Sequence, residues 1–337
     1  MNIPVQPDYP GRRRACFGLA ALLLSGMQPG NAATTASFPT RPVVFVVPYS
    51  PGSVADLWAR MISPKLSKMW GQPVLVENRP GGSAQIAMAH VKNSKPDGHT
   101  LLLGSLSTSM AKLTNSKMAY DPQIEFLPVY KYLSFRIIFA TNDKTYENAK
   151  SLNELAEYSQ STTNGIFSGD GGVGTTFNMA LSFVLKDMNF KYEAVSFNSF
   201  TDMSLALLRN DVQVIMNTPA VLKTYLQEKT MYPLAALAES RYSEWPELPT
   251  VREAGYEGFL PEIWNGVFAP KGTPVEVLDK ISEDIDTVSM DPEMKKKIES
   301  TFSATIPRGG RAAFEKYLID ETKQWENVLN EINFKPL

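Results

Sequence analysis

The chain has 337 residues, of which 43% are hydrophobic and 20% are charged, and its formal net charge is −2. This composition is typical of a globular protein with a large core and excludes a disordered chain. The weak acidity, without a dense basic cluster, argues against nucleic acid as a partner.

The N-terminus has the pattern of an export signal. Three arginines at 12–14 precede an apolar stretch at 15–24, and small residues follow at 30–33. This order predicts a signal peptide over residues 1–33, cleavage near Ala32 or Ala33, and a periplasmic protein. An ordinary secretory signal is favoured, with the twin-arginine route as the alternative. The length that remains after cleavage favours two domains over one.

The chain after this signal begins with alternating strands and helices. An apolar run at 42–47 predicts a buried strand. Ser53 and Asp56 form an S-x-x-D cap that begins a helix, which Pro64 should kink or restart and Gly71 should end. Two further strands are expected at 73–77 and 100–104, with a helix between them at 84–91. This order predicts a parallel sheet covered by helices on both faces.

The same alternation returns after an extended stretch at 126–140. Helices are expected at 151–159, 175–186 and 200–209, and strands at 165–167, 192–195 and 212–216. A return crossing is expected at 261–268, followed by helices at 274–288, 292–300 and 311–332. Two α/β units joined by two crossings predict two lobes with a cleft between them. Lobe 1 would comprise 38–135 plus 262–337, and lobe 2 would comprise 136–261.

Three glycine-rich turns, each between a strand and a helix, occur at 46–53, 77–83 and 168–176. The first N–H groups of a helix have no partner within it, and the helix dipole makes this end attractive to anions. Several such turns in an exported protein predict the capture of small anions.

Longer motifs resemble a known family. They occupy 38–42, 47–56, 71–81, 95–104, 249–255 and 264–274. In order and spacing they resemble the periplasmic substrate-binding proteins of tripartite tricarboxylate transporters, the Bug family. The resemblance implies a two-lobe α/β Venus-flytrap fold, with a mostly parallel sheet flanked by helices in each lobe. It also implies a protein without catalytic activity or cofactor that closes on a small organic carboxylate.

The resemblance further implies a set of ligand-binding residues. In the family, the first two turns hold the ligand's carboxylate through backbone amides, and the second lobe contacts its far end. Matched by motif position, the first lobe would use Ser50, Gly52, Ser53, Val54, Asp56, Gly82, Ser83, Ala84, Gln85, Ser105 and Ser107. The second lobe would use Gly172, Gly174, Thr175, Thr176, Phe197, Asn198, Ser199 and Asn217. For Asp56, completing the helix cap is favoured over ligand contact.

Several residues depart from the family's usual pattern. Ser53 and Ser199 replace glycines, and the second turn has fewer glycines than usual, which reduces backbone freedom. Asn178, Asn198 and Asn217 stand where histidine, a basic residue and an acidic residue are common. These changes remove charge and add bulk, so we expect an altered specificity. Three phenylalanines lie near these positions, namely Phe177, Phe197 and Phe200. A role in the hydrophobic core is favoured for them, and the alternative is that they line a pocket for an aromatic ligand.

Other functions find less support in the sequence. Residues 169–174 match G-x-G-x-x-G and Glu193 follows, but this motif alone is weak evidence for a dinucleotide-dependent enzyme. A hydrolase is not favoured, because the sequence has no G-x-S-x-G motif whose serine His90 or His99 could activate. The sequence also has no metal-binding motif. The partners implied are the membrane permease subunits of the transporter, with a sensor protein as the alternative, and a monomer is expected.

Overall fold

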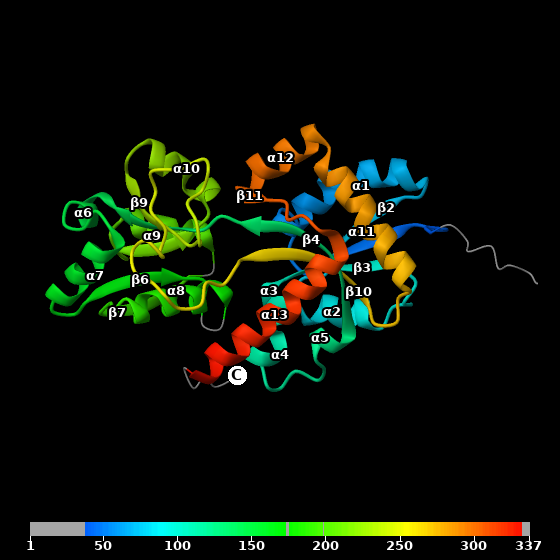
Figure 1. Cartoon of the computed structure of the whole chain (residues 1–337), viewed down its shortest axis with the longest axis horizontal. Coiled ribbons are helices and arrows are strands. Elements are labelled where there is room, and N and C mark those ends of the chain that lie inside the picture. The colour runs from blue at the N-terminus through cyan, green and yellow to red at the C-terminus, as the bar shows by residue number, and fades with distance from the viewer. Residues whose placement is uncertain (1–37, 173–174, 198, 332–337) are drawn as a thin grey trace, which may run out of the picture. The chain divides into compact units, whose positions relative to one another are not determined.

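The structure is a computed structural model that describes residues 38–172, 175–197 and 199–331. The signal-peptide and cleavage-site predictions lie outside these residues. The described chain forms two lobes, each built on one mixed β-sheet with helices against it (Figure 1).

The first sheet has six strands. In spatial order these are β11 (Ala304–Thr305), β4 (Phe126–Phe135), β10 (Trp264–Pro270), β3 (Thr100–Ser105), β1 (Val43–Val47) and β2 (Val74–Asn78). β1 pairs in parallel with β2 and β3, whereas β10 is antiparallel to β3 and β4. The longer helices of this lobe are α1 (Val54–Trp70), α2 (Gln85–Lys92), α11 (Val275–Met290), α12 (Pro292–Phe302) and α13 (Gly310–Glu331). Three short helices follow β3: α3 (Leu106–Ser109), α4 (Ala111–Thr114) and α5 (Pro122–Glu125).

The second sheet has five strands. In spatial order these are β7 (Tyr192–Ser196), β6 (Ile166–Asp170), β8 (Val214–Asn217), β5 (Ile138–Asn142) and β9 (Met231–Ala236). β6 is parallel to β7 and β8, whereas β5 is antiparallel to β8 and β9. Its helices are α6 (Asp143–Tyr146), α7 (Leu152–Ser161), α8 (Thr176–Asp187), α9 (Phe200–Leu208) and α10 (Pro219–Gln227).

The two-lobe α/β fold is therefore confirmed, with sheets that are mixed rather than mostly parallel. The parallel part of each sheet comes from strands joined by helical crossovers, as the sequence pattern predicts. The antiparallel part comes from strands near the crossings between lobes. β4 and β5 follow each other along the extended stretch at 126–140 but belong to different sheets, and β10 returns the chain to the first sheet.

Local sequence explains how α1 is placed after β1. The side chain of Ser53 caps the helix by accepting from the Asp56 N–H, and Gly71 ends it in the left-handed conformation, at φ 63°. The expectation that Pro64 restarts the helix is wrong, because α1 is one helix from Val54 to Trp70. Pro64 is exposed, so the carbonyl that loses its helical donor is left on the solvent side, where water can satisfy it.

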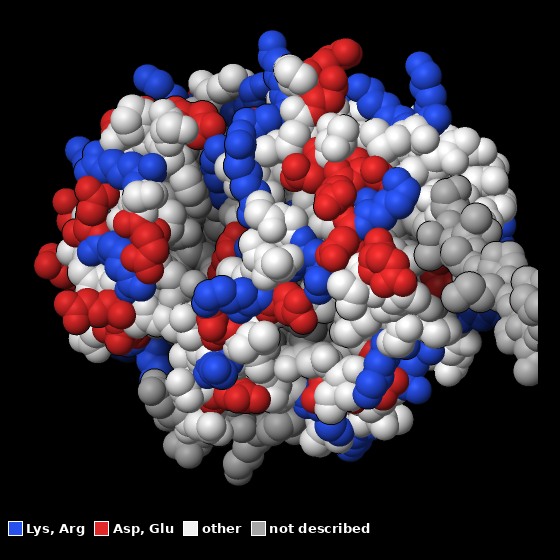
Figure 2. Space-filling view, turned by 45° about the vertical axis from the view of Figure 1, so that its right-hand side comes forward, with Lys and Arg blue, Asp and Glu red and all other residues white. Residues whose placement is uncertain are grey.

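The distribution of surface charge and the length of the helices are two further features of the described residues. On the face shown in Figure 2, basic and acidic side chains are interspersed. None of the helices in the described ranges is both long and apolar enough to cross a bilayer.

Candidate functional site

A cavity of about 450 Å³ lies where strand-to-helix turns of both lobes meet. Seven of the residues predicted to bind a ligand line it, namely Gly52, Ser53, Val54, Ser105, Ser107, Thr175 and Asn217. The first and third glycine-rich turns, separated by more than a hundred residues in sequence, thus reach one cavity.

Other predicted residues are not part of the lining. In the first lobe these are Ser50, Asp56, Gly82, Ser83, Ala84 and Gln85, and in the second lobe Gly172, Phe197 and Ser199. Gly174 and Asn198 lie outside the described residues, as does the side chain of Thr176. The second glycine-rich turn, at Gly81–Gln85, is therefore the largest part of the predicted set that does not border the cavity.

The structure adds lining residues that the sequence did not single out. They are Tyr49, Ala55, Leu57, Leu106, Phe135, Thr218, Ala220, Val221, Ile263, Trp264, Asn265, Thr301 and Phe302. One of them had a local signal in the sequence: Thr218 caps α10 and precedes a proline at the first helical position, a common helix start. Phe177 and Phe200, which belong to the aromatic alternative, also line the cavity, whereas Phe197 packs with the core of the second lobe.

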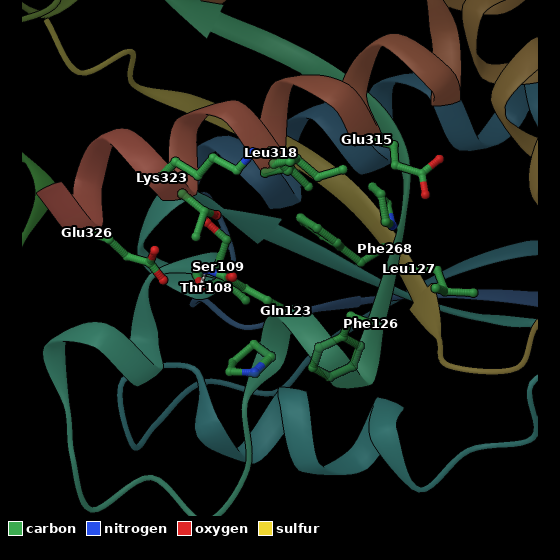
Figure 3. A pocket seen from close by; sticks show the side chains of 14 residues that line it. Thr108, Ser109, Gln123, Phe126, Leu127, Phe268, Glu315, Leu318, Lys323 and Glu326 are labelled. Atoms are coloured by element: carbon green, nitrogen blue, oxygen red, sulfur yellow. Dashed lines mark hydrogen bonds between the residues drawn. The ribbon is translucent and has the colours of Figure 1, made fainter.

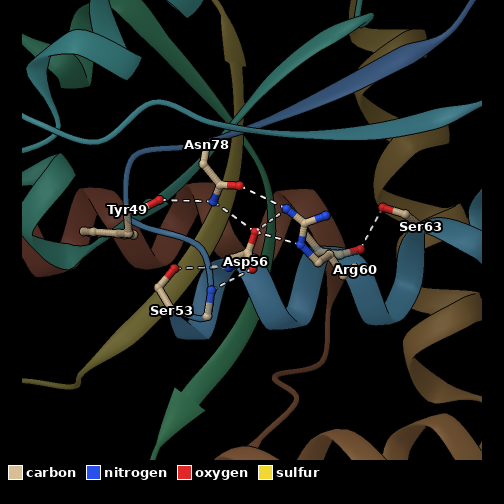
Figure 4. A network of polar contacts seen from close by, with 8 residues as sticks. Tyr49, Ser53, Asp56, Arg60, Ser63 and Asn78 are labelled. Atoms are coloured by element: carbon tan, nitrogen blue, oxygen red, sulfur yellow. Dashed lines mark hydrogen bonds and ion pairs between the residues drawn. The ribbon is translucent and has the colours of Figure 1, made fainter.

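Asp56 organises the first turn from inside the protein, with only 2% of its surface exposed. Its carboxylate accepts hydrogen bonds from the Gly52 N–H at 2.9 Å, Arg60 Nε at 3.0 Å and Asn78 Nδ2 at 2.9 Å (Figure 4). Asn78 also donates to the Tyr49 carbonyl at 3.1 Å, which ties the end of β2 to the same turn. This arrangement favours the structural role expected for Asp56.

The charge of Asp56 is maintained by these contacts. Burial by itself would raise the pKa of the carboxyl, but the hydrogen bonds from Arg60, Gly52 and Asn78 outweigh it and lower the pKa below its usual value. The turn is therefore fixed by an ionised carboxylate that is not part of the cavity lining.

The cavity side of this turn presents hydrogen-bond donors. The N–H groups of Val54 and Ala55 lie in the first turn of α1, and neither donates to another group in the described part of the chain. Nearby, the hydroxyls of Tyr49 and Ser105 are 2.9 Å apart. Burial raises the pKa of the Tyr49 hydroxyl, so it stays protonated and is available as a donor. These groups can stabilise an anion without a cationic side chain.

The second lobe uses a similar device. Asp170, at the end of β6, accepts from the Gly172 N–H at 2.7 Å, from Asn178 Nδ2 at 2.6 Å and from Ser196 Oγ at 2.9 Å. The side chain of Thr175 caps α8 by accepting from the Asn178 N–H. α10 begins beside it, with Thr218, Ala220 and Val221 in the lining. The N-termini of α1, α8 and α10 therefore border one cavity, and each adds a partial positive charge.

The lining contains no Lys, Arg, His, Asp or Glu among the residues that the structure describes. Stabilisation of an anion there depends on amides, hydroxyls and helix dipoles. In the described ranges, no group of three or more His, Cys, Asp or Glu side chains could hold a metal ion.

The second glycine-rich turn continues a glycine-like backbone beyond Gly81 and Gly82 into two residues that are not glycine. Ser83 and Ala84 have φ angles of 50° and 73°, in the left-handed region that favours glycine. Ala84 is also the residue that immediately precedes α2. The strain at each position is on the order of 1 kcal/mol.

A further cavity of about 410 Å³ lies within the first lobe. Figure 3 shows side chains of α13, including Glu315, Lys323 and Glu326, facing Gln123 and Phe126 across it. Unlike the first cavity, it is bordered by charged side chains of both signs and by one lobe only. It lacks the glycine-rich turns and is not the candidate site.

Known proteins are similar to this chain over most of its length. Residues 58–334 match the family model described as "Tripartite tricarboxylate transporter family receptor" (TctC). A protein of the tcbD-tcbE intergenic region of Pseudomonas sp. (strain P51) is 26% identical to this chain, over 95% of this chain and 94% of its own. BugT of Bordetella pertussis is 26% identical, over 89% of this chain and 91% of its own.

Two solved structures are similar at comparable identity. A protein from R. palustris with adipate is 26% identical, with a TM-score of 0.76 over 89% of this chain and all of that one (100%). MatC from Rhodopseudomonas palustris, with bound malate, is 27% identical, with a TM-score of 0.72 over 87% of this chain and 100% of that one.

The family match covers most of the chain and bears directly on the alternatives. Its members are receptors, so the hypothesis of a dinucleotide-dependent enzyme is wrong. The structure gives a reason: Gly169 and Asp170 of the G-x-G-x-x-G match lie in β6, and Asp170 is buried as the organiser of its own turn. The chain belongs to the tripartite tricarboxylate transporter family of receptors.

Proposed function

We propose that this receptor captures a small organic carboxylate in the cavity of about 450 Å³ between its two lobes. Lobe 1 would be 38–135 plus 262–337, and lobe 2 would be 136–261. The observation that carries the proposal is the meeting of three helix N-termini, those of α1, α8 and α10, at a cavity without charged side chains among its described lining residues.

The binding residues that we propose are the predicted ones that line the cavity, together with Ala55. The carboxylate would accept hydrogen bonds from the N–H groups of Val54 and Ala55 and from the hydroxyls of Ser53 and Ser105. Each charge-assisted bond contributes about 1.5–3 kcal/mol. Thr175 and Asn217 would contact the ligand from the second lobe. The relatives with adipate and malate support a carboxylate as the ligand class.

The cellular role follows from the family. The protein would be exported through the predicted signal at 1–33, act in the periplasm, and deliver its ligand to membrane subunits of a tripartite tricarboxylate transporter. The family match and the periplasmic binding protein BugD among the structural neighbours support this role.

A thermal-shift screen tests the ligand class. The purified protein is heated with mono-, di- and tricarboxylates, each beside its neutral amide, and with NAD as the control for the enzyme hypothesis. A ligand at 100 times its Kd adds about 2.7 kcal/mol to the free energy of unfolding, which is a visible shift in Tm. We expect at least one acid to shift Tm and its amide not to. Equal shifts by acid and amide, or none by any acid, would overturn the proposal.

A further inference from the structure

The lining of the same cavity carries information about the body of the ligand. Val54, Leu57, Phe200 and Val221 are large apolar residues with 37%, 44%, 39% and 40% of their surface exposed. Val54 and Leu57 come from α1 in the first lobe, and the other two come from α9 and α10 in the second. Exposed apolar side chains that gather around one cavity from opposite sides indicate an apolar occupant.

Aromatic rings form one part of this lining. Phe177 and Phe200 lie in the first turns of α8 and α9, with ring centroids 4.7 Å apart and planes at 60°. Trp264, from β10, lines the cavity as well. The second lobe thus presents rings at two of its helix starts, where a bound aromatic ring gains edge-to-face contacts beyond simple burial.

The donors of α10 are largely used within the protein. Pro219 has no N–H, the Thr218 N–H donates to Asn217 Oδ1 at 2.8 Å, and the Val221 N–H donates to Thr218 Oγ1 at 3.5 Å. A second carboxylate placed against this helix would find few donors and no cationic side chain among the described lining residues. Burying a charge without such partners is costly.

We propose that the ligand is an aromatic monocarboxylate, an aryl acid with its carboxylate at the start of α1 and its ring between Val54, Phe177, Phe200 and Val221. This inference rests on the proposed function and narrows it. A cavity of about 450 Å³ has room for a ring and a short side chain.

Isothermal titration calorimetry compares benzoate and 3-phenylpropanoate with adipate, malate and benzamide. We expect the better aryl acid to bind at least tenfold more tightly than either aliphatic diacid, and benzamide not to bind. Adipate or malate binding as tightly as the aryl acids overturns the inference and leaves the proposed function standing. Binding of benzamide alone, or of no acid, overturns both.

A matched pair of variants tests the position of the ring. Phe200 and Phe167 are both 39% exposed, but only Phe200 lines the cavity. We expect Phe200→Ala to weaken aryl-acid binding at least tenfold and Phe167→Ala to change it less than twofold. Phe200→Leu, which keeps an apolar side chain at this position, should also weaken binding, and thermal unfolding confirms that each variant is folded. Unchanged affinity in the two folded Phe200 variants overturns the inference.

Discussion

At the scale of single residues, two buried carboxylates hold the glycine-rich turns that reach the cavity. Asp56 binds its turn from within α1, and Asp170 binds its turn from the end of β6. Neither side chain lines the cavity. Each fixes backbone amides so that others remain free for a ligand, which is a positioning role rather than ligand contact.

The sequence alone supports only part of this account. Ser53 and Asp56 are three positions apart within one capping pattern, so the cap could be predicted. Asn78 meets Asp56 across 22 residues of sequence, and Ser196 meets Asp170 across 26. Such contacts depend on strand register and are not encoded in any local pattern. The left-handed backbone of Ser83 and Ala84 is also invisible locally, because neither residue type favours it.

Replacing the Asp56 carboxylate by an amide tests its role. Asp56→Asn keeps the shape but loses the ion pair with Arg60 and turns one acceptor into a donor. We expect the free energy of unfolding to fall by about 2 kcal/mol, as measured by urea unfolding at pH 7. Asp202→Asn is the matched control, since Asp202 occupies the same position of an S-x-x-D cap but is exposed. Asp202→Asn should lower the free energy of unfolding by less than about 1 kcal/mol.

The same variant has a pH signature. The folded pKa of Asp56 is lowered, so its stabilising contribution is present above the unfolded pKa and disappears as the pH falls through the folded value. The stability gap between the wild type and Asp56→Asn should therefore narrow below about pH 4. A gap that stays constant down to pH 2 would contradict the role assigned to this carboxylate.

At the scale of elements, α13 is tied to the strand that forms part of the cavity lining. Glu321, 5% exposed, accepts from Trp264 Nε1 at 3.0 and 2.9 Å and from the Tyr317 hydroxyl at 2.6 Å. Lys131 lies over the Tyr317 ring at 3.5 Å and pairs with Glu262 at 2.5 Å. Burial raises the pKa of Glu321 to about 7, against the opposing effects of Tyr317, Trp264 and Lys131.

This raised pKa predicts a stability change near neutral pH. At pH values between the ordinary pKa of a glutamate and about 7, Glu321 keeps a proton in the folded state, whereas the unfolded chain releases it. The free energy of unfolding therefore falls as the pH rises through this range. Glu321→Gln lacks this titration. The wild type should therefore lose about 2 kcal/mol relative to the variant between pH 5 and pH 8, measured by urea unfolding.

A control on the same helix separates this effect from general charge. Glu326 is exposed, so Glu326→Gln should follow the wild type across the same pH range. Parallel pH profiles of the wild type and Glu321→Gln would contradict a raised pKa at Glu321.

The positions of the helices and strands were mostly predictable, because capping residues and apolar runs are local signals. The patterns described above predict neither α10 nor β9, although Thr218-Pro219 is a helix-start signal.

At the scale of the whole molecule, two lobes follow from the repeated α/β pattern, whereas the cavity does not. Its lining combines the start of α1, the end of β3 with the start of α3, and the starts of α8, α9 and α10 with β10. The first and third glycine-rich turns indicate the starts of α1 and α8. The remaining segments meet them only through the fold, and the second turn, which has the same local appearance, does not border the cavity.

The central claim is that the first amide of α1 binds the ligand's carboxylate, and proline at this position tests it. Proline is favoured at the first helical position, and Ser53, at ψ 160°, has the extended backbone that should precede it. Val54→Pro therefore removes one donor and should leave the helix intact. Val275→Pro makes the same change at the start of α11, where Val275 is exposed and is not part of the cavity lining.

The measurement is calorimetric titration of the wild type and both variants with the best carboxylate from the thermal-shift screen. Loss of one charge-assisted hydrogen bond costs about 1.5–3 kcal/mol, so Val54→Pro should weaken binding by roughly 10-fold to 150-fold. Val275→Pro should bind as the wild type does, and both variants should unfold near the wild-type temperature. Wild-type affinity in a folded Val54→Pro protein would contradict the assignment of this helix start as the carboxylate site.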